Sequence, residues 1–330
     1  MIRAQRMVAC VAAMLRYRFV VAAGLLFAML GCRRSKPTPA LEPARPAQSV
    51  ASSEPAVDAA PSASGRAAPA ASSVSMGDAS APLDASSAAC PADMAKLVRS
   101  CIDRYEAILV LRDDAGTEVR HPWYERPEKG VVYAARSVAG EFPQAYISRV
   151  EAAAACKNAG KRLCTMNEWR RGCMGSRWWT WPYGNRPKAG ACNNGKPHLL
   201  SRMFGSDGKA WKYDEHFNNP ALDQEPGFLA RGGEYAGCSN VEGIFDMVGN
   251  LHEWVSDTVT SELVERMNSE DVERRYQPWR EGNGVFLGGF FSTTSEHGPG
   301  CRFTTIAHEP SYHDYSIGFR CCLSIPGTKR

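Results

Sequence analysis

Cysteine content constrains this chain more than any other feature of its sequence. Twelve of its 330 residues are cysteines, and ten of these lie between residues 90 and 322. An even number of cysteines in an exported chain predicts disulfides, here five. Each would restrict the unfolded chain by roughly 2–4 kcal/mol, which suits a domain with little helix and sheet. No Cys-x-x-Cys pair occurs, so a zinc site is not expected.

Export is indicated by the start of the chain. Residues 1–36 hold seven basic side chains and no acidic one, and residues 19–30 form an apolar run. This pattern is a secretory signal, and the run is shorter than the roughly 20 residues of a spanning helix. Met29-Leu30-Gly31-Cys32 resembles a bacterial lipobox, which implies cleavage before a lipidated Cys32. An ordinary signal peptide, with Cys32 unmodified, is the alternative.

We therefore expect a lipoprotein signal peptide over residues 1–31 and an anchor at Cys32. Arg33 follows the anchor in place of Asp, which favours an outer-membrane lipoprotein of the bacterial cell envelope. Residues 32–89 are rich in Ala, Pro and Ser and poor in large apolar side chains, so they predict a disordered tether. Residues 90–330 suit one domain. The net charge of +4 becomes −3 without the seven basic residues near the start, so we expect no nucleic-acid partner.

Two helix starts stand out within the expected domain. Ser148-Arg-Val-Glu151 and Thr165-Met-Asn-Glu168 each match a capping box, in which the hydroxyl and the carboxylate satisfy amides at the helix end. The first helix should stop near Gly160, and the second should run to about Cys173. Apolar stretches at residues 102–111, 284–291 and 317–323 predict strands.

Three motifs occur in a recognisable order: Lys161-Arg-Leu-Cys-Thr-Met-Asn-Glu-Trp169, Asp246-Met-Val-Gly-Asn-Leu-His-Glu-Trp254 and Gly318-Phe-Arg-Cys-Cys322. Together they resemble the sulfatase-modifying-factor domain of formylglycine-generating enzymes. The resemblance covers roughly residues 101–322. It implies an α+β fold related to C-type lectins, rich in loops, with short helices and antiparallel strands. A fold of this kind hosts several functions, so the site must decide the reaction.

The resemblance also implies part of the disulfide pattern. Cysteines in both helices of the family's fold bridge to the C-terminal segment, which implies the pairs Cys156–Cys321 and Cys173–Cys301. No motif carries the pairing of the remaining six cysteines. For these we suggest Cys90–Cys101, Cys164–Cys322 and Cys192–Cys238.

Formylglycine-generating enzymes bind copper(I) with two cysteines in the segment after a Gly-Gly pair, and soft thiolates suit that ion. The matching segment here, residues 288–301, holds one cysteine, Cys301, at the position of the implied disulfide. The two reactive positions fall near Phe291 and Glu296, and neither side chain offers a thiolate. We therefore expect no copper and no formylglycine formation. Other catalysis stays open.

A calcium site is implied by the motif at residues 246–253. The family's ligands correspond to the carboxylates of Asp246 and Glu253 and to the carbonyls of Gly249 and Leu251, all hard oxygen donors. Asn193 is a candidate for a second calcium site. The alternative is a turn whose polar groups satisfy one another without metal.

Late histidines form a second candidate site. His308 and His313, with Asp314, are candidate metal ligands or acid–base groups. Five-residue spacing on a loop is no metal signature, and hydrogen-bonded histidines that hold the loop are the alternative. The aromatic run Trp178-Trp-Thr-Trp-Pro-Tyr183 suits either stacking on a glycan or packing in the core.

Three functions follow from these observations. The first is an envelope-anchored binding or scaffold module for a peptide, protein or glycan, because loops on a rigid fold suit recognition. The second is a metal-dependent oxidoreductase with a noncanonical site around His308 and His313. The third is an envelope assembly factor.

Overall fold

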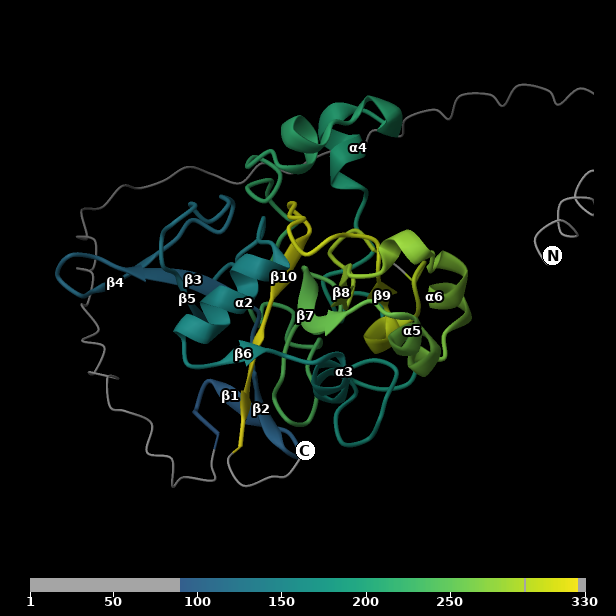
Figure 1. The fold of residues 1–330 in the computed structure, drawn as a ribbon, viewed down its shortest axis with the longest axis horizontal. Helices are drawn as coiled ribbons and strands as arrows, with labels where there is room; N and C mark the ends of the chain where they lie inside the picture. The colour runs from purple at the N-terminus through teal and green to yellow at the C-terminus, as the bar shows by residue number, and fades with distance from the viewer. Residues whose placement is uncertain (1–89, 294, 326–330) are drawn as a thin grey trace, which may run out of the picture. The chain divides into compact units, whose positions relative to one another are not determined.

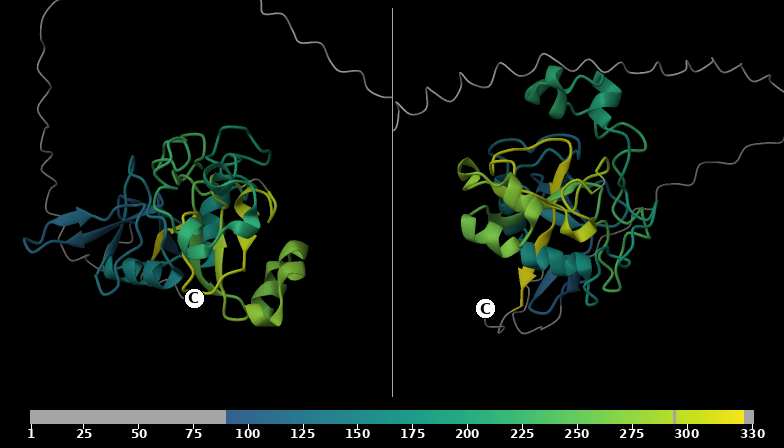
Figure 2. Two further views of the ribbon diagram at one scale, coloured as in Figure 1. Left: turned by 90° about the horizontal axis from the view of Figure 1, so that it is seen from above. Right: turned by 90° about the vertical axis from the view of Figure 1, so that its right-hand side faces the viewer.

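The computed structural model describes residues 90–325 apart from residue 294. The expected signal peptide, Cys32, the tether and residues 326–330 lie outside the described residues. Three small sheets and several short helices make up the described part (Figures 1 and 2). None of the helices in this part is long and apolar enough to cross a membrane.

The first sheet joins the two ends of the described chain. The last strand, β11 (Cys321–Ser324), lies between β2 (Ser100–Asp103) and β6 (Arg162–Leu163), and β1 (Met94–Lys96) forms the edge beside β2. All three pairings are antiparallel.

The second sheet lies at the centre of the described part in Figure 1 and has the order β10-β7-β8-β9. Its strand β10 (Ile317–Phe319) runs parallel to β7 (His252–Thr258). The other two pairings are antiparallel, with β8 (Gly284–Leu287) between β7 and β9 (Thr304–Thr305).

The third sheet is antiparallel, with β3 (Ala107–Arg112) between β4 (Glu118–Arg120) and β5 (Ala134–Ser137).

Two helices begin at the predicted capping boxes. Helix α2 (Arg149–Asn158) has Ser148 as its N-cap, and helix α3 (Met166–Met174) has Thr165; in both, the reciprocal hydrogen bonds with the following Glu are present. Helix α2 ends at Asn158. A single residue, Ala159, separates it from Gly160, which has a positive φ of 70°. Both predictions are confirmed, because capping depends on residues only three positions apart.

The sequence analysis did not predict the shorter helices. Each α-helix among them has six or seven residues, too few for a clear 3.6-residue apolar period. The α-helices are α4 (Leu199–Phe204), α5 (Ser261–Met267) and α6 (Glu270–Arg275). Single turns complete the set: η1 (Gly208–Ala210), η2 (Tyr213–Phe217), η3 (Pro278–Arg280) and η4 (Gly300–Arg302).

The three predicted strands are shorter than expected. Residues 102–111 divide into the end of β2 and β3, with the buried Glu106 at the break. Strand β8 stops at Leu287, because Gly288 and Gly289 follow with positive φ values of 87° and 76°. Residues 317–323 divide at Arg320 into β10 and β11, which belong to different sheets. Each interruption therefore occurs at a polar residue that turns inward or at a left-handed glycine.

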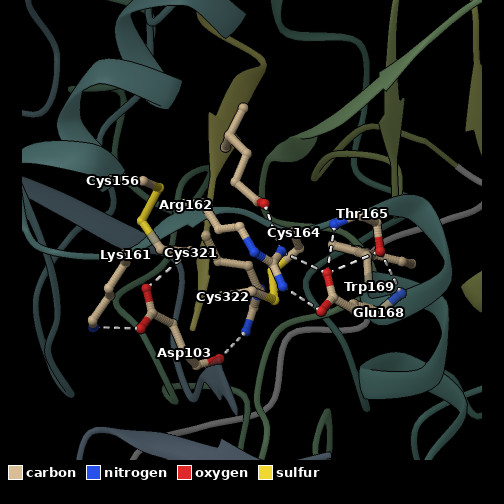
Figure 3. The surroundings of a disulfide bond; sticks show 12 residues. Asp103, Cys156, Lys161, Arg162, Cys164, Thr165, Glu168, Trp169, Cys321 and Cys322 are labelled. Carbon is tan, nitrogen blue, oxygen red and sulfur yellow. Dashed lines mark hydrogen bonds and ion pairs between the residues drawn. A yellow bond between two sulfur atoms is a disulfide. The ribbon is translucent and has the colours of Figure 1, made fainter. Parts of the chain in front are cut away.

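Disulfides connect these elements across long stretches of sequence. Cys156–Cys321 joins α2 to β11, Cys164–Cys322 joins the residue after β6 to β11, and Cys173–Cys301 joins α3 to η4. Cys90–Cys101 and Cys192–Cys238 complete the set. These are the five pairs given in the sequence analysis, so the expectation of a disulfide-rich domain is confirmed. Figure 3 shows the first two, which lie side by side at the start of β11.

Candidate functional site

The second and third sequence motifs meet in the central sheet. Strand β10 lies parallel to β7, with Ile317 opposite His252, Gly318 opposite Glu253 and Phe319 opposite Trp254. The next residue, Arg320, leaves the sheet and turns its side chain toward Glu253. Residues 67 positions apart in sequence are thus brought into direct contact.

Glu253 and Arg320 form a buried ion pair. The Arg320 Nε atom donates to Glu253 Oε2 at 2.6 Å, and Nη2 donates to Oε1 at 2.8 Å. Trp169 of the first motif donates its indole N–H to the same Oε2 at 2.8 Å. All three side chains are excluded from solvent. One network therefore holds all three sequence motifs together, and paired, hydrogen-bonded geometry is what allows charges to be buried.

Two further carboxylates surround this pair. Glu106 accepts from the backbone N–H of Leu251 at 3.0 Å and from the side-chain amide of Asn250. Asp246, at a φ of 59°, accepts from the Gly233 N–H at 2.7 Å. Both are buried, so three carboxylates share one guanidinium. The sequence analysis missed Glu106, although an acidic residue beside the apolar strand β3 was a usable signal.

The excess negative charge perturbs the pKa values of these groups. Burial first, and then the charges of Glu253 and Asp246, hold the pKa of Glu106 well above its ordinary range. Burial also raises the pKa of Asp246 to about 7, against the opposing effect of the Gly233 N–H. Although burial opposes it, the surrounding carboxylates keep the pKa of Arg320 above its usual value. Protons on Glu106 and Asp246 can thus neutralise the surplus charge.

The predicted calcium ligands fit calcium only in part. Asp246 offers a carboxylate, but Glu253 is taken by Arg320 and Trp169 and is no available bidentate ligand. The turn is also tightly packed, because a Cβ on Gly249 would lie 2.1 Å from the carbonyl oxygen of Asn193. In the described part of the chain, no three His, Cys, Asp or Glu side chains are grouped closely enough to hold a metal ion. Calcium at this loop stays a prediction, and no reaction step depends on it.

Asn193, the candidate for a second calcium site, supports the same loop. Its carbonyl oxygen accepts from the Asn250 N–H at 2.8 Å. Its side-chain amide donates to Asn250 Oδ1 at 2.7 Å and to the Phe228 carbonyl at 2.9 Å. The contacts of Asn193 are thus those of a structural residue, and its side-chain oxygen is buried without a hydrogen-bond partner among the described residues.

The histidine candidates do not converge on one another. His308 stacks on Tyr312, with 3.7 Å between ring centroids, and burial lowers its pKa to about 4. The His313 ring hydrogen-bonds to Asn218 at 2.6 Å. Asp314 is buried and accepts from Tyr312 and Ser316. These contacts agree with the alternative interpretation given in the sequence analysis, in which hydrogen-bonded histidines keep the loop in place.

One buried carboxylate near this loop was not singled out from the sequence. Asp223 is buried, and neither of its carboxylate oxygens has a hydrogen-bond partner among the described residues. Burial, and then the charge of Asp314, hold its pKa well above the ordinary value. An unpartnered buried carboxylate is costly when charged, and this cost favours the protonated form of Asp223.

The segment in which the sequence analysis expected the family's reactive cysteines, residues 288–301, contributes to an aromatic cluster. Phe291 is buried, with its ring 5.6 Å from that of Phe228. Glu296 is exposed. Cys301 is buried in its disulfide with Cys173. The two positions near which the reactive cysteines would fall thus hold an apolar ring and a hard oxygen donor.

The aromatic run is divided between core and surface. Trp181 packs in the core, whereas Trp178 is 64% exposed and lies under the guanidinium of Arg171, 4.9 Å from its ring centroid. Trp179 has a similar contact with Arg177. The run is therefore neither wholly core nor a continuous aromatic platform.

The described part has the expected α+β architecture, with short helices and mainly antiparallel strands. A family model for the Sulfatase-modifying factor enzyme 1-like domain matches residues 112–325. The chain belongs to this family.

Several known proteins are similar to this chain. The formylglycine-generating enzyme of the mouse (Mus musculus) is 27% identical over 220 residues, which are 62% of this chain and 49% of the mouse protein. The chain thus spans about half the length of that relative. Among solved structures, CarF aligns with a TM-score of 0.35 and 16% identity over 56% of this chain and 69% of CarF. The Major Tropism Determinant I1 variant aligns with a TM-score of 0.36 and 14% identity over 71% and 53%.

Proposed function

We propose that this protein is an envelope-anchored binding or scaffold module that uses the family's domain without its copper centre. One observation carries the proposal: all ten cysteines among the described residues are in disulfides. Copper(I) binding and cysteine oxidation need thiolates, and a disulfide sulfur has none to offer. Cys301, the one cysteine of the matching segment, is held by Cys173.

The neighbouring positions support the same conclusion. A buried phenylalanine at position 291 provides no electron-pair donor, and the exposed carboxylate of Glu296 prefers harder ions than copper(I). The three motif residues of the buried network around Arg320 are excluded from solvent. Its role is to position strands and loops, which suits a rigid scaffold that displays a binding surface.

A metal-dependent oxidoreductase around His308 and His313 is not favoured. The two rings have separate partners, Tyr312 for one and Asn218 for the other. An acid–base pair needs both groups within reach of one reacting atom. No contact between these two histidines supports such a site.

Formylglycine formation is the test of this proposal. The full chain would be loaded with copper and incubated with dioxygen and a cysteine-containing peptide of the sulfatase type, and mass spectrometry would search for aldehyde. We expect none. Cys301→Ser and Cys173→Ser form a matched pair, because both break the same disulfide but only the second keeps a thiol at position 301. Aldehyde that survives Cys173→Ser and is lost in Cys301→Ser would overturn the proposal.

Membrane attachment rests on the sequence, since Cys32 lies outside the described residues. We propose that Cys32 carries the lipid and that the outer membrane holds the protein. Mass spectrometry of the mature N-terminus tests this attachment. A mature chain that begins at any residue other than an acylated Cys32 would contradict it.

A further inference from the structure

A cleft of about 1270 Å³ opens on the side of the domain formed by the β1–β2 turn, α2 and the start of α3. Small-molecule pockets have volumes of roughly 300–1,000 Å³, so a larger open cleft better suits a polypeptide segment. The residues of the buried Glu253–Arg320 pair are not among those that line it.

The wall of the cleft is rigid. Lys161, Arg162 and Leu163 line it at the strand β6, directly between the disulfides that bind Cys156 and Cys164 to β11 (Figure 3). The Lys161 Nζ atom donates a hydrogen bond to the Asp103 carboxylate at 2.6 Å. The Arg162 guanidinium forms a bidentate ion pair with the Glu168 carboxylate, with N–O distances of 2.6 and 2.7 Å. A surface held in this way loses little conformational freedom when a partner binds.

Apolar side chains are exposed in the cleft. Val98 at the β1–β2 turn is 71% exposed, and Val150 on α2 is 60% exposed. Ala153 and Lys157 follow Val150 at three- and seven-residue intervals, so these residues share one face of α2. Single exposed apolar residues are ordinary, but these converge on one concavity. The side of α2 that faces away from the core thus presents apolar side chains to the cleft.

Basic side chains also line the cleft. Arg149, Lys157 and Arg171 line the cleft, and no salt bridge in the described part of the chain joins any of them to a carboxylate. Arg149 donates to the carbonyls of Val255 and Ser256, and Arg171 to that of Gly175. These are neutral acceptors. The Arg171 guanidinium also lies over the ring of Trp178, and the charge of Asp257 acts on Arg149 without a salt bridge between them.

We propose that this cleft binds an acidic segment of a partner protein that also carries apolar side chains. The inference rests on the binding function proposed above and deepens it by naming a surface and a partner chemistry. Carboxylates would meet Arg149, Lys157 and Arg171, while aliphatic side chains would cover Val98 and Val150. The described lining holds no aromatic ring on which a sugar could stack. Its concave shape does not match a flat bilayer surface.

Fluorescence anisotropy with the full, unreduced chain tests the proposal. The probe is a fluorescein-labelled peptide of alternating Glu and Leu, compared with versions in which Gln replaces Glu or Ser replaces Leu. We expect saturable binding of the first peptide that weakens at high salt, and weaker binding of both altered versions. Lys157→Glu should raise the Kd about fivefold, as expected for a partly exposed charge at a binding surface. Val150→Ser should have an effect of about the same size through lost apolar contact.

Lys209→Glu is the matched control, because it makes the same charge change on the exposed turn η1, outside the cleft lining. It should leave the Kd unchanged. No saturable binding, or equal weakening by Lys209→Glu and Lys157→Glu, would overturn the inference. So would binding to anionic phospholipid vesicles that depends on Lys157 while no peptide binds. Aldehyde formation in the copper assay would instead overturn the function proposed above and leave peptide binding in the cleft intact, so the two failures are distinguishable.

Discussion

Replacing Arg320 with methionine should destabilise the domain strongly, because one guanidinium serves three buried carboxylates. The substitution keeps an unbranched side chain but removes both hydrogen bonds to Glu253 and the donors to the carbonyls of Asp103 and Phe245. Removing one partner of a buried ion pair costs about 3–5 kcal/mol. For a domain of this size, that loss corresponds to a fall in Tm of roughly 6–20 °C.

The cost should also depend on pH. Arg320 lowers the pKa values of Glu106 and Asp246, which are nevertheless above their ordinary range. Without the guanidinium these pKa values rise further. The folded state then binds more protons than the unfolded state, so stability falls as pH rises from the unfolded pKa toward the folded one. The variant should therefore lose more stability between about pH 5 and about pH 8 than the wild type does.

Urea unfolding of the full, unreduced chain, followed by tryptophan fluorescence, measures both effects. Arg136→Met is the matched control, because Arg136 pairs with Glu118 on a part of the surface where both side chains are about one-third exposed. That pair should contribute no more than about 1 kcal/mol. Equal losses in the two variants would refute the reasoning, and so would a loss in Arg320→Met that does not change with pH.

Three further predictions concern the surrounding structure. Gly249→Ala should destabilise the domain by several times as much as Gly190→Ala in urea unfolding. Both glycines have a positive φ, but only at Gly249 would an added Cβ collide with a neighbour, the carbonyl of Asn193. Equal losses of stability in the two variants would contradict this prediction. Asp223→Asn should raise the free energy of unfolding at about pH 8 and have little effect near pH 4. Each unit by which folding raises the pKa of Asp223 corresponds to about 1.4 kcal/mol of stability lost at the higher pH. Destabilisation by the variant at about pH 8 would show that Asp223 has a charged partner. The Tm should be higher in calcium than in chelator, and the difference should be larger at about pH 8 than at about pH 6, because the metal must displace the proton on Asp246. Identical melting curves in calcium and in chelator would exclude the site.

Local features of the sequence determined the helix starts. Each capping box depends on a hydroxyl and a carboxylate three residues apart, so α2 and α3 were visible without any knowledge of the fold. The family and its fold class were also accessible, since three motifs in order suffice to recognise them. Helices α4, α5 and α6 were not, because six or seven residues carry too short a pattern.

Only the tertiary structure decided what the polar residues do. Glu253 looked like a calcium ligand in its motif, but Arg320, 67 residues later, occupies its carboxylate. Glu106 joins the same cluster across 145 residues. The division of residues 317–323 into two sheets also follows from the inward turn of Arg320. Helix capping and motif spacing depend on neighbours along the chain, so the sequence by itself determined them. The burial and pairing of charged groups depend on which distant segments meet, so only the tertiary structure decided them.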